Sequence, residues 1–366
     1  MESIRIAWFN WRCIKNPEAG GAEVFTHEVA RRLVKMGYDI SLVTSQPGNL
    51  PSEEVIEGYR VLRSGNKYTV YLKAKKIYET FLEDDVDLVI DEINTVPFFT
   101  VMYVKEPVVV LIHQLAREFW LYELKPPISW IGYAIEPHYL KLYRDRPAIT
   151  VSNSTKSDLK ALGFRKIFIV PEGLSLEPLD KLPEKEKEPT IVFLGRLKKV
   201  KRPDHAIKAF IYVKKEIPRS KLWIVGDGPL KPSLKKLIEK MGLEEDVIFY
   251  GRVNEREKIE LLRRAHVLVF PGIREGWGLV ITEANSQGTP AVAYDVPGLR
   301  DSVRHMKTGI LVPRDDIKAL ANSLILILEN EDLRKKLSIN ALNWAKNFSW
   351  DRTAIEFSKV LKQVAH

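Results

Sequence analysis

The first half of the chain alternates short apolar runs with longer stretches of helical periodicity. An amphipathic stretch over residues 22–36 ends at Gly37, and Ser154 or Thr155 is placed to cap a further helix. This alternation is typical of a parallel sheet covered by helices on both faces. The expected strands are residues 4–9, 39–44, 87–90, 108–112, 148–151 and 167–170.

Residues 177–189 interrupt this alternation, because they are rich in proline and charge and lack apolar periodicity. That composition is typical of a linker. A second alternation follows and predicts another Rossmann-like unit, after which the chain is helical from about residue 313 almost to its end. The expected strands are 190–194, 221–225, 247–249, 267–270 and 291–293, and the expected helices are 204–216, 230–241, 255–265 and one that begins at Leu279.

The length supports the same division, because 366 residues exceed the size at which a single core stops growing. We expect an α/β protein with a first domain over residues 1–176, a linker over 177–189 and a second domain over 190–348. Ligands of such sheets bind beyond the carboxyl ends of the strands. Two doubly wound sheets that face each other would therefore form a binding cleft between the domains.

Composition excludes several classes of protein. Cys13 is the only cysteine, which rules out an internal disulfide and a cysteine-based zinc cluster and fits a reducing cytoplasm. No secretory signal precedes the first strand pattern, and no apolar run approaches the roughly 20 residues of a membrane span. The sequence therefore predicts a folded cytoplasmic protein.

The net charge of +9 is unevenly distributed. Residues 1–180 carry 22 basic and 24 acidic side chains, whereas residues 181–366 carry 35 and 24. A positive second half would attract an anionic small molecule. Nucleic acid would be served by the same charge, so the distribution narrows the choice of ligand without deciding it.

Two glutamates mark a glycine-rich turn in this basic half. Glu275 is expected in the loop that follows strand 267–270, and Glu283 in the next helix. Backbone N–H groups of Gly278 and Leu279 at the helix start would favour a phosphate, while the carboxylates could accept hydroxyl groups of a sugar and a ribose. The alternative is a pair of solvated glutamates.

The other strand ends of the second half carry glycine and basic residues. Arg196 and Lys201 follow the first strand of this half and could clamp a diphosphate. A solvated basic run or a nucleic-acid patch is the alternative for residues 196–202, although the aromatic residues that stack on bases are missing there. Glycines at the strand ends, which would let a ligand approach the backbone or simply form tight turns, are Gly195, Gly226, Gly251 and Gly298.

The first half offers two candidate features. Gly20 and Gly21 open a helix and could receive a phosphate or a sugar, but they form neither a dinucleotide fingerprint nor a Walker A loop. His113 ends an apolar strand and would project into the cleft, or else pack as a core residue. The remaining histidines lack metal-ligand spacing, so we expect no metal site.

Together with several shorter motifs, these residues resemble the retaining glycosyltransferases of family 4, also called glycosyl transferases group 1, which have the GT-B fold. The shorter motifs are Ser152 and residues 171–173, 226–229, 249–251, 288–290 and 309–312. The resemblance extends over nearly the whole chain. It implies an enzyme of glycan biosynthesis whose last segment, residues 349–366, returns to the first domain.

The resemblance also implies roles for individual residues. Arg196 and Lys201 would neutralise the donor diphosphate, Glu275 would hold hydroxyls of the transferred sugar, and Glu283 would bind the ribose. His113 would face the transferred sugar near the acceptor hydroxyl. The implied donor-binding residues are Gly20, Gly21, Gly195, Gly226, Gly251, Arg252, Gly276, Gly278, Leu279, Val280 and Glu283.

Three positions depart from the family pattern. Gly272 stands where serine is usual and Trp277 where phenylalanine is common, and both changes should affect only the packing of the loop. Residues 297–299 replace a pair of glycines, which leaves one contact to the donor undefined.

The implied reaction transfers a hexose-type sugar from a UDP-, GDP- or ADP-sugar to a sugar or lipid-linked acceptor, with retention of configuration. The resemblance implies neither a cofactor nor a metal nor an enzyme nucleophile, so that catalysis would rest on orientation and on cationic stabilisation of the departing diphosphate. Two rivals are a GT-B nucleotide-sugar epimerase and a protein that binds nucleotides or nucleic acid without catalysis. We expect no nucleic-acid partner.

Residues 119–143 are crowded with aromatic side chains and follow His113, where an acceptor should enter. These side chains could stack on a sugar, lie against lipid head groups or pack on their own domain. Peripheral contact with the cytoplasmic face of a membrane is therefore one expectation for this segment.

Overall fold

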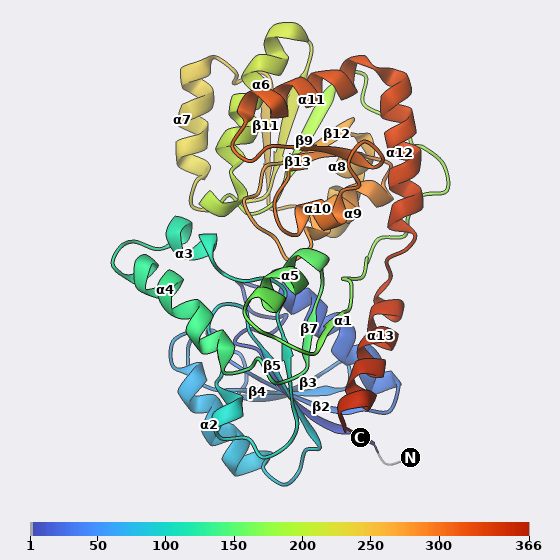
Figure 1. The fold of residues 1–366 in the computed structure, drawn as a ribbon. Helices are drawn as coiled ribbons and strands as arrows, with labels where there is room; N and C mark the ends of the chain where they lie inside the picture. Colours follow the sequence, from blue (N-terminus) through green and yellow to red (C-terminus); the bar gives the residue numbers. More distant parts are fainter. Residues whose placement is uncertain (1–2, 366) are drawn as a thin grey trace. The chain divides into compact units, whose positions relative to one another are not determined.

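The computed structural model describes residues 3–365 and consists of two compact units (Figure 1). Unit 1 comprises the chain up to Arg117, the segment Trp130–Gly173 and the C-terminal segment from Ser349. Unit 2 comprises Glu118–Ser129 and Leu174–Phe348. Each unit has its own sheet and its own hydrophobic core, and each is described separately.

Unit 1 contains an eight-stranded sheet with the order β3-β4-β2-β1-β5-β6-β7-β8. All pairings are parallel except that of β3 with β4. The central strands are apolar and buried on both faces, as expected for a parallel sheet covered by helices. The strands are β1 (Arg5–Phe9), β2 (Asp39–Thr44), β3 (Glu53–Ile56), β4 (Tyr59–Arg63), β5 (Leu88–Glu92), β6 (Val108–Leu111), β7 (Ala148–Thr150) and β8 (Ile167–Ile169).

The C-terminal helix α13 (Trp350–Ala365) belongs to unit 1 and packs along α1 (Gly21–Lys35). Phe357 stacks on Trp8 of β1 with ring centroids 5.3 Å apart, and the Tyr38 hydroxyl lies 2.7 Å from that of Ser358. These contacts bury the apolar face of α13, so the segment completes the core of unit 1. The other helices of this unit are α2 (Val70–Phe81), η1 (Thr100–Met102), α4 (Ile128–Lys141) and α5 (Asn153–Ala161); the first two residues of α4 group with unit 2.

The sequence patterns missed the hairpin formed by β3 and β4. Its two-residue turn, Glu57 and Gly58, has positive φ at both positions, as tight hairpins require. The exposed face of β3 carries Glu53 and Val55 and the other face carries Glu54 and Ile56, so the strand lacks the continuous apolar run that identified its neighbours.

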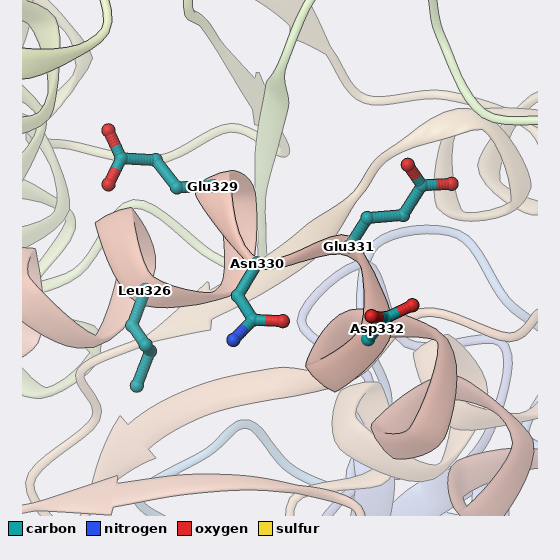
Figure 2. A pocket seen from close by; sticks show the side chains of 5 residues that line it. All are labelled: Leu326, Glu329, Asn330, Glu331 and Asp332. Atoms are coloured by element: carbon teal, nitrogen blue, oxygen red, sulfur yellow. The ribbon is translucent and has the colours of Figure 1, made fainter.

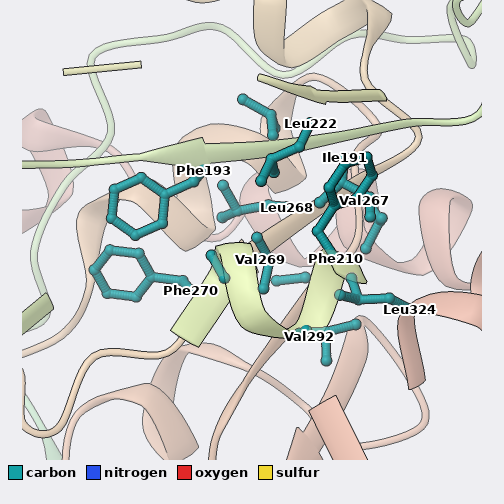
Figure 3. Packing of buried hydrophobic residues seen from close by; sticks show 14 of the residues in the cluster. Ile191, Phe193, Phe210, Leu222, Val267, Leu268, Val269, Phe270, Val292 and Leu324 are labelled. Carbon is teal, nitrogen blue, oxygen red and sulfur yellow. The ribbon is translucent and has the colours of Figure 1, made fainter. Parts of the chain in front are cut away.

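Unit 2 contains a six-stranded, fully parallel sheet with the order β11-β10-β9-β12-β13-β14. Five strands were expected, and the sixth is β14. Figure 3 shows buried hydrophobic side chains of these strands packed together with Phe210 and Leu324. The strands are β9 (Thr190–Leu194), β10 (Lys221–Val225), β11 (Val247–Gly251), β12 (Val267–Phe270), β13 (Ala291–Tyr294) and β14 (Gly309–Val312).

The helices of unit 2 follow the predicted crossovers closely. The α-helices are α3 (Glu118–Glu123), α6 (Pro203–Glu216), α7 (Lys231–Met241), α8 (Glu255–Arg264), α9 (Leu279–Ser286), α10 (Leu299–Ser302), α11 (Ile317–Glu329) and α12 (Glu331–Ala345), and a 3₁₀ turn, η2, spans Lys199–Lys201. The predicted fold class, two doubly wound α/β domains, is confirmed for the two units.

Contacts assign two further segments, α3 and the predicted linker, to unit 2. Glu118 forms ion pairs with Arg274 and Arg314, which ties α3 to unit 2 although its sequence lies in the first half. The predicted linker packs on unit 2 as well, because Leu179 N donates to Ser286 O and Lys185 Nζ donates to Thr289 Oγ1. This proline-rich, charged segment is therefore held against unit 2 by hydrogen bonds.

The strand orders define one switch point in each sheet. In unit 1 the chain turns from one side of β1 to the other between β1 and β5, and in unit 2 between β9 and β12. Loops that leave the carboxyl ends of such neighbours diverge and leave room for a ligand. The candidate residues of each unit are therefore sought at the strand ends of its own sheet.

Candidate functional site

Lys201 and Glu275 meet at the switch point of unit 2. Lys201 closes the 3₁₀ turn η2 after β9, and Glu275 lies in the loop after β12. The lysine Nζ donates to Glu275 Oε1, and the two side chains are mostly but not completely buried. A cation and an anion thus stand together where an anionic, hydroxyl-bearing ligand of a doubly wound sheet would bind.

Glu283 forms a second pair of opposite charges on the first turns of α9. Its Oε1 accepts a hydrogen bond of 2.7 Å from Lys258 Nζ of α8. Burial lowers the pKa of Lys258, but the charges and hydrogen bonds of Glu283 and Glu255 outweigh burial and raise it. Lys258 is therefore firmly cationic and holds the Glu283 carboxylate in place.

Helix α9 begins after a glycine with positive φ that lies between the two glutamates. Gly278 has φ +89°, and a Cβ there would lie 2.8 Å from Leu299 Cδ2. The helix starts directly afterwards at Leu279 and Val280, whose first-turn amides have no partner within the helix. Such amides, with the positive end of the helix dipole, suit a phosphate.

The neighbouring strand ends are made of glycine because their backbones touch. A Cβ on Gly226 would lie only 2.0 Å from Gly195 O, and a Cβ on Gly228 would lie 2.7 Å from Leu197 O. Gly226 N also donates to Gly251 O at 2.7 Å, which joins three of the predicted donor-side glycines in one layer. Side chains at these positions would push apart the loops at the carboxyl ends of the strands, which we call the rim.

The departures from the family pattern lie around Glu275. A Cβ on Gly272 would lie 3.2 Å from Glu275 Oε1, so a serine there would crowd the carboxylate. Pro297 O accepts from Glu275 N at 3.1 Å, and a Cβ on Gly298 would lie 2.1 Å from Glu275 O. Residues 297–299 therefore support the backbone of Glu275.

The remaining predicted residues of unit 2 lie at the same rim with different exposure. Arg196 is half-buried directly after β9, Gly276 is half-buried beside Glu275, and Arg252 is exposed after β11. Arg274, which directly precedes Glu275, forms an ion pair with Glu118 of α3, with Nε 2.5 Å from Oε2.

His113 lies at the end of β6 in unit 1 between two buried glutamates. Its Nδ1 is 3.3 Å from Glu172 Oε1, and its Nε2 is 3.4 Å from Glu92 Oε1. The ring also meets Phe25 edge to face at 4.9 Å, and only 6% of the residue is exposed. The structure therefore confines His113 among charged side chains of its own unit.

The two carboxylates determine the charge of this histidine. Burial alone would lower the pKa of His113, but hydrogen bonding and charge from Glu172 and Glu92 outweigh it and raise the pKa to about 10. The other oxygen of Glu92 accepts from Trp8 Nε1 at 2.8 Å and from Thr26 Oγ1 at 2.5 Å. His113 is thus a fixed imidazolium at neutral pH and has no free lone pair to act as a base.

The predicted glycine pair adjoins this cluster at the start of α1. Gly20 N donates to Glu23 Oε2 at 2.6 Å, so the carboxylate caps the helix, while Arg12 Nε donates to Glu23 Oε1 at 2.9 Å. Burial raises the pKa of Glu23, against the lowering effect of Arg12. Gly21 is exposed at the first helical position, whereas the Gly20 amide is already engaged.

Sequence reasoning missed Glu92, Glu172 and Lys258. Glu92 follows the apolar run of β5 as the second of two acids, a position that marks a strand end and could have indicated a role. Glu172 lies in a motif that was recognised only as part of the resemblance. Lys258 gives no signal in the sequence, because its partner Glu283 lies 25 residues away.

One surface hollow lies away from these strand ends. Figure 2 shows a surface depression between α11 and α12, lined by Leu326, Glu329, Asn330, Glu331 and Asp332, none of which belongs to the predicted site. Within residues 3–365 no group of three or more histidine, cysteine, aspartate or glutamate side chains is arranged to hold a metal ion. Nor does that part of the chain contain a helix long and apolar enough to cross a membrane.

Comparison with known proteins identifies the two halves. The model of glycosyl transferases group 1 matches residues 177–344, and that of Glycosyltransferase Family 4 matches residues 19–178. A D-inositol 3-phosphate glycosyltransferase of Streptomyces scabiei is 33% identical over a region covering 48% of this chain and 41% of that protein. The match therefore spans less than half the length of that relative.

Solved structures with this fold cover nearly the whole chain. A sucrose-phosphate synthase from Thermosynechococcus elongatus matches with a TM-score of 0.80 and 20% identity, over 98% of both chains. Anabaena HepE, in complex with UDP and glucose, matches with a TM-score of 0.74 and 16% identity, over 98% of this chain and 100% of that chain. These structures confirm the fold, and the two family models confirm the predicted family resemblance.

Proposed function

Since the chain belongs to the glycosyl transferases of group 1 and has their GT-B fold, we propose that it transfers a hexose-type sugar from a nucleotide-diphosphate sugar to a carbohydrate or lipid-linked acceptor, with retention and without a metal. The observation that carries this proposal is the pairing of Lys201 with Glu275 at the switch point of unit 2. The complex of HepE with UDP and glucose supports a uridine donor as the first to test.

The pairs of opposite charge suit the parts of such a donor. Lys201 would leave Glu275 for the diphosphate, and the released carboxylate would accept hydroxyl groups of the sugar. Glu283, held by Lys258, would accept the ribose hydroxyls, while the first amides of α9 would meet the distal phosphate. The diphosphate, the sugar and the ribose of the donor then each find a partner within one unit.

The chemistry requires one bond to break and one to form at the same face of the sugar. The bond from the anomeric carbon to the diphosphate oxygen breaks as the acceptor oxygen bonds to that carbon, and the departing phosphate oxygen takes the acceptor proton. Lys201 and Arg196 would stabilise the charge that develops on the diphosphate. His113 would act as a fixed cation, because both of its ring nitrogens face carboxylates.

A thermal-shift screen with UDP-, GDP- and ADP-sugars, each with and without EDTA, tests the donor class directly. We expect one nucleotide to raise the melting temperature, and we expect EDTA to leave that increase unchanged. No stabilisation by any of the three would overturn the proposal. An increase that EDTA abolishes would overturn the metal-independent part.

Product analysis with the stabilising donor, labelled in its sugar, then separates transfer from the rival activities. Label in a new glycoside whose anomeric configuration matches the donor supports retaining transfer. Label in a different nucleotide sugar would indicate an epimerase. Salt-sensitive binding of oligonucleotides without protection by any nucleotide sugar would indicate a non-catalytic protein.

A further inference from the structure

Helix α4 exposes an apolar face. Trp130, Ile131, Ile135 and Leu142, which directly follows the helix, are 64%, 53%, 49% and 54% exposed. The opposite face is buried in unit 1, where Tyr139, Leu140 and Tyr143 pack in the core. The segment is therefore apolar on both sides, which is usual for an element covered on both sides and unusual for one open to solvent.

The exposed side chains form one continuous stripe. Ile131, Ile135, His138 and Leu142 follow one another at spacings of four, three and four residues, and Trp130 and Ala134 lie on the adjoining row. We call the set Trp130, Ile131, Ala134, Ile135 and Leu142 the α4 face. An exposed apolar patch of this kind marks an interaction surface.

The helix is fixed to unit 1 by its one acidic residue. Glu136 accepts hydrogen bonds from Ala116 N at 2.5 Å and Arg117 N at 2.7 Å. Arg117 in turn lies over the Tyr133 ring at 3.8 Å. The α4 face is thus presented on a rigid support, and no carboxylate of the helix points to solvent, since Glu136 is buried.

Basic residues border the α4 face at its C-terminal end. Lys141, Arg144 and Arg146 are exposed, and the one acid among them, Asp145, is drawn to Arg144 and Arg165 at 3.5 and 3.6 Å. An apolar stripe that contains tryptophan and has a basic border is the chemistry of a helix lying in the interface of an anionic membrane. A second copy of this chain would offer this basic border no carboxylate from its own α4 helix, because Glu136 is buried.

We propose that the α4 face docks on the surface of a membrane that contains anionic lipid. Trp130, Ile131 and Ile135 enter the boundary between head groups and acyl chains, while Lys141, Arg144 and Arg146 contact lipid phosphates. The interaction is peripheral. It goes beyond the proposed transfer reaction and does not depend on it, because no donor or acceptor takes part.

Vesicle flotation of the whole protein tests this proposal in the absence of any sugar nucleotide. Wild-type protein should float with vesicles of phosphatidylglycerol and phosphatidylcholine and should float less with phosphatidylcholine alone. The variant Trp130→Ser/Ile131→Ser/Ile135→Ser should lower the bound fraction at least about tenfold. The matched control Tyr68→Ser/Leu72→Ser, which removes two exposed apolar side chains elsewhere on unit 1, should bind like wild type.

A charge variant covers the case in which the triple serine variant does not fold. Lys141→Gln/Arg144→Gln/Arg146→Gln should weaken flotation with anionic vesicles and reduce its dependence on salt. The proposal is overturned if wild-type protein does not float or if it binds neutral and anionic vesicles equally. It is also overturned if the serine variant and the charge variant float as well as wild type. Concentration-dependent dimers that the serine variant abolishes, without any flotation, would assign the α4 face to a second copy.

Discussion

The carboxyl ends of the two sheets are built in opposite ways. In unit 1 they carry large polar side chains that bond to one another, with Glu92, His113 and Glu172 buried together. In unit 2 they carry glycines whose backbones touch, with charged pairs at the edge. In unit 1 the charged groups pair with one another and hold His113 in place. In unit 2 backbone amides and partly exposed charged side chains can contact a ligand.

We therefore expect substitutions of glutamates to lower stability in unit 1 and activity in unit 2. Glu92→Gln removes the carboxylate that faces His113 and should destabilise the protein by about 3 kcal/mol, because a buried cation loses one of its two partners. Chemical denaturation followed by circular dichroism measures this loss. The control Glu53→Gln, which breaks the exposed pair with Arg60, should cost less than about 1 kcal/mol. Equal stability of the two variants would show that the unit 1 cluster carries no structural charge.

In unit 2 the corresponding change should affect activity and leave stability nearly intact. Glu275→Ala and Lys201→Ala should each lower kcat/KM for the donor found in the screen by about a hundredfold or more, because each removes a group aimed at the developing charge or the sugar. The melting temperature should change little. Lys199→Ala, an exposed residue of the same basic run, is the control. Wild-type rates in either site variant would refute the assignment of the site.

Glycine spacing offers a third way to sharpen the comparison. Gly226→Ala places a Cβ 2.0 Å from Gly195 O and should destabilise the protein by more than about 2 kcal/mol, since backbone must move. Gly242 also has a positive φ, +64° against +128° at Gly226, but a Cβ there meets open space, so Gly242→Ala should cost about 1 kcal/mol. Urea denaturation of both variants measures the difference. Similar losses would mean that the rim around Gly226 is not closely packed.

The contrast also explains what could be predicted from sequence. Apolar runs identified the central strands. Glu275, Gly278 and Glu283 lie within one loop and one helix, so this part of the unit 2 site is local in sequence, whereas the partners Lys201 and Lys258 come from other segments. The cluster around His113 joins Trp8 to Glu172 across the order of the sheet, which apolar patterns do not encode. The strand β14 was not among the expected strands, because its apolar run is only four residues long and begins with a glycine.

The aromatic segment shows the same limit. Sequence left open whether it contacts an acceptor, a membrane or its own core, and the structure divides it. Tyr139 and Tyr143 are buried, with hydroxyls bonded to Thr95 O and Asp91 Oδ2 at 2.5 and 2.6 Å, whereas Trp130 is exposed. Because this helix is apolar on both faces, its sequence does not indicate which face packs inward. The structure does, because Glu136 anchors the inward face to Ala116 N.

Two buried histidines provide the smallest effect and the most direct comparison of the units. His113 has a pKa raised to about 10, so its stabilisation is complete below pH 6.5, the ordinary value, and is lost as the pH rises towards 10. His266, in unit 2, accepts from Thr190 N at 3.0 Å, and burial lowers its pKa to about 4. Its stabilisation is complete above pH 6.5 and is lost as the pH falls towards 4.

The free energy of unfolding should therefore fall on both sides of neutrality, by on the order of 2 kcal/mol on each side. Urea denaturation between pH 4.5 and pH 9.5, roughly the span of the two shifts, measures both slopes. His113→Gln should flatten the alkaline slope alone, and His266→Gln the acidic slope alone, because the groups titrate in opposite directions in separate units. If either variant changed both slopes, or neither, the two histidines would not be independent, and the contrast between a charged cluster in unit 1 and a neutral acceptor in unit 2 would fail.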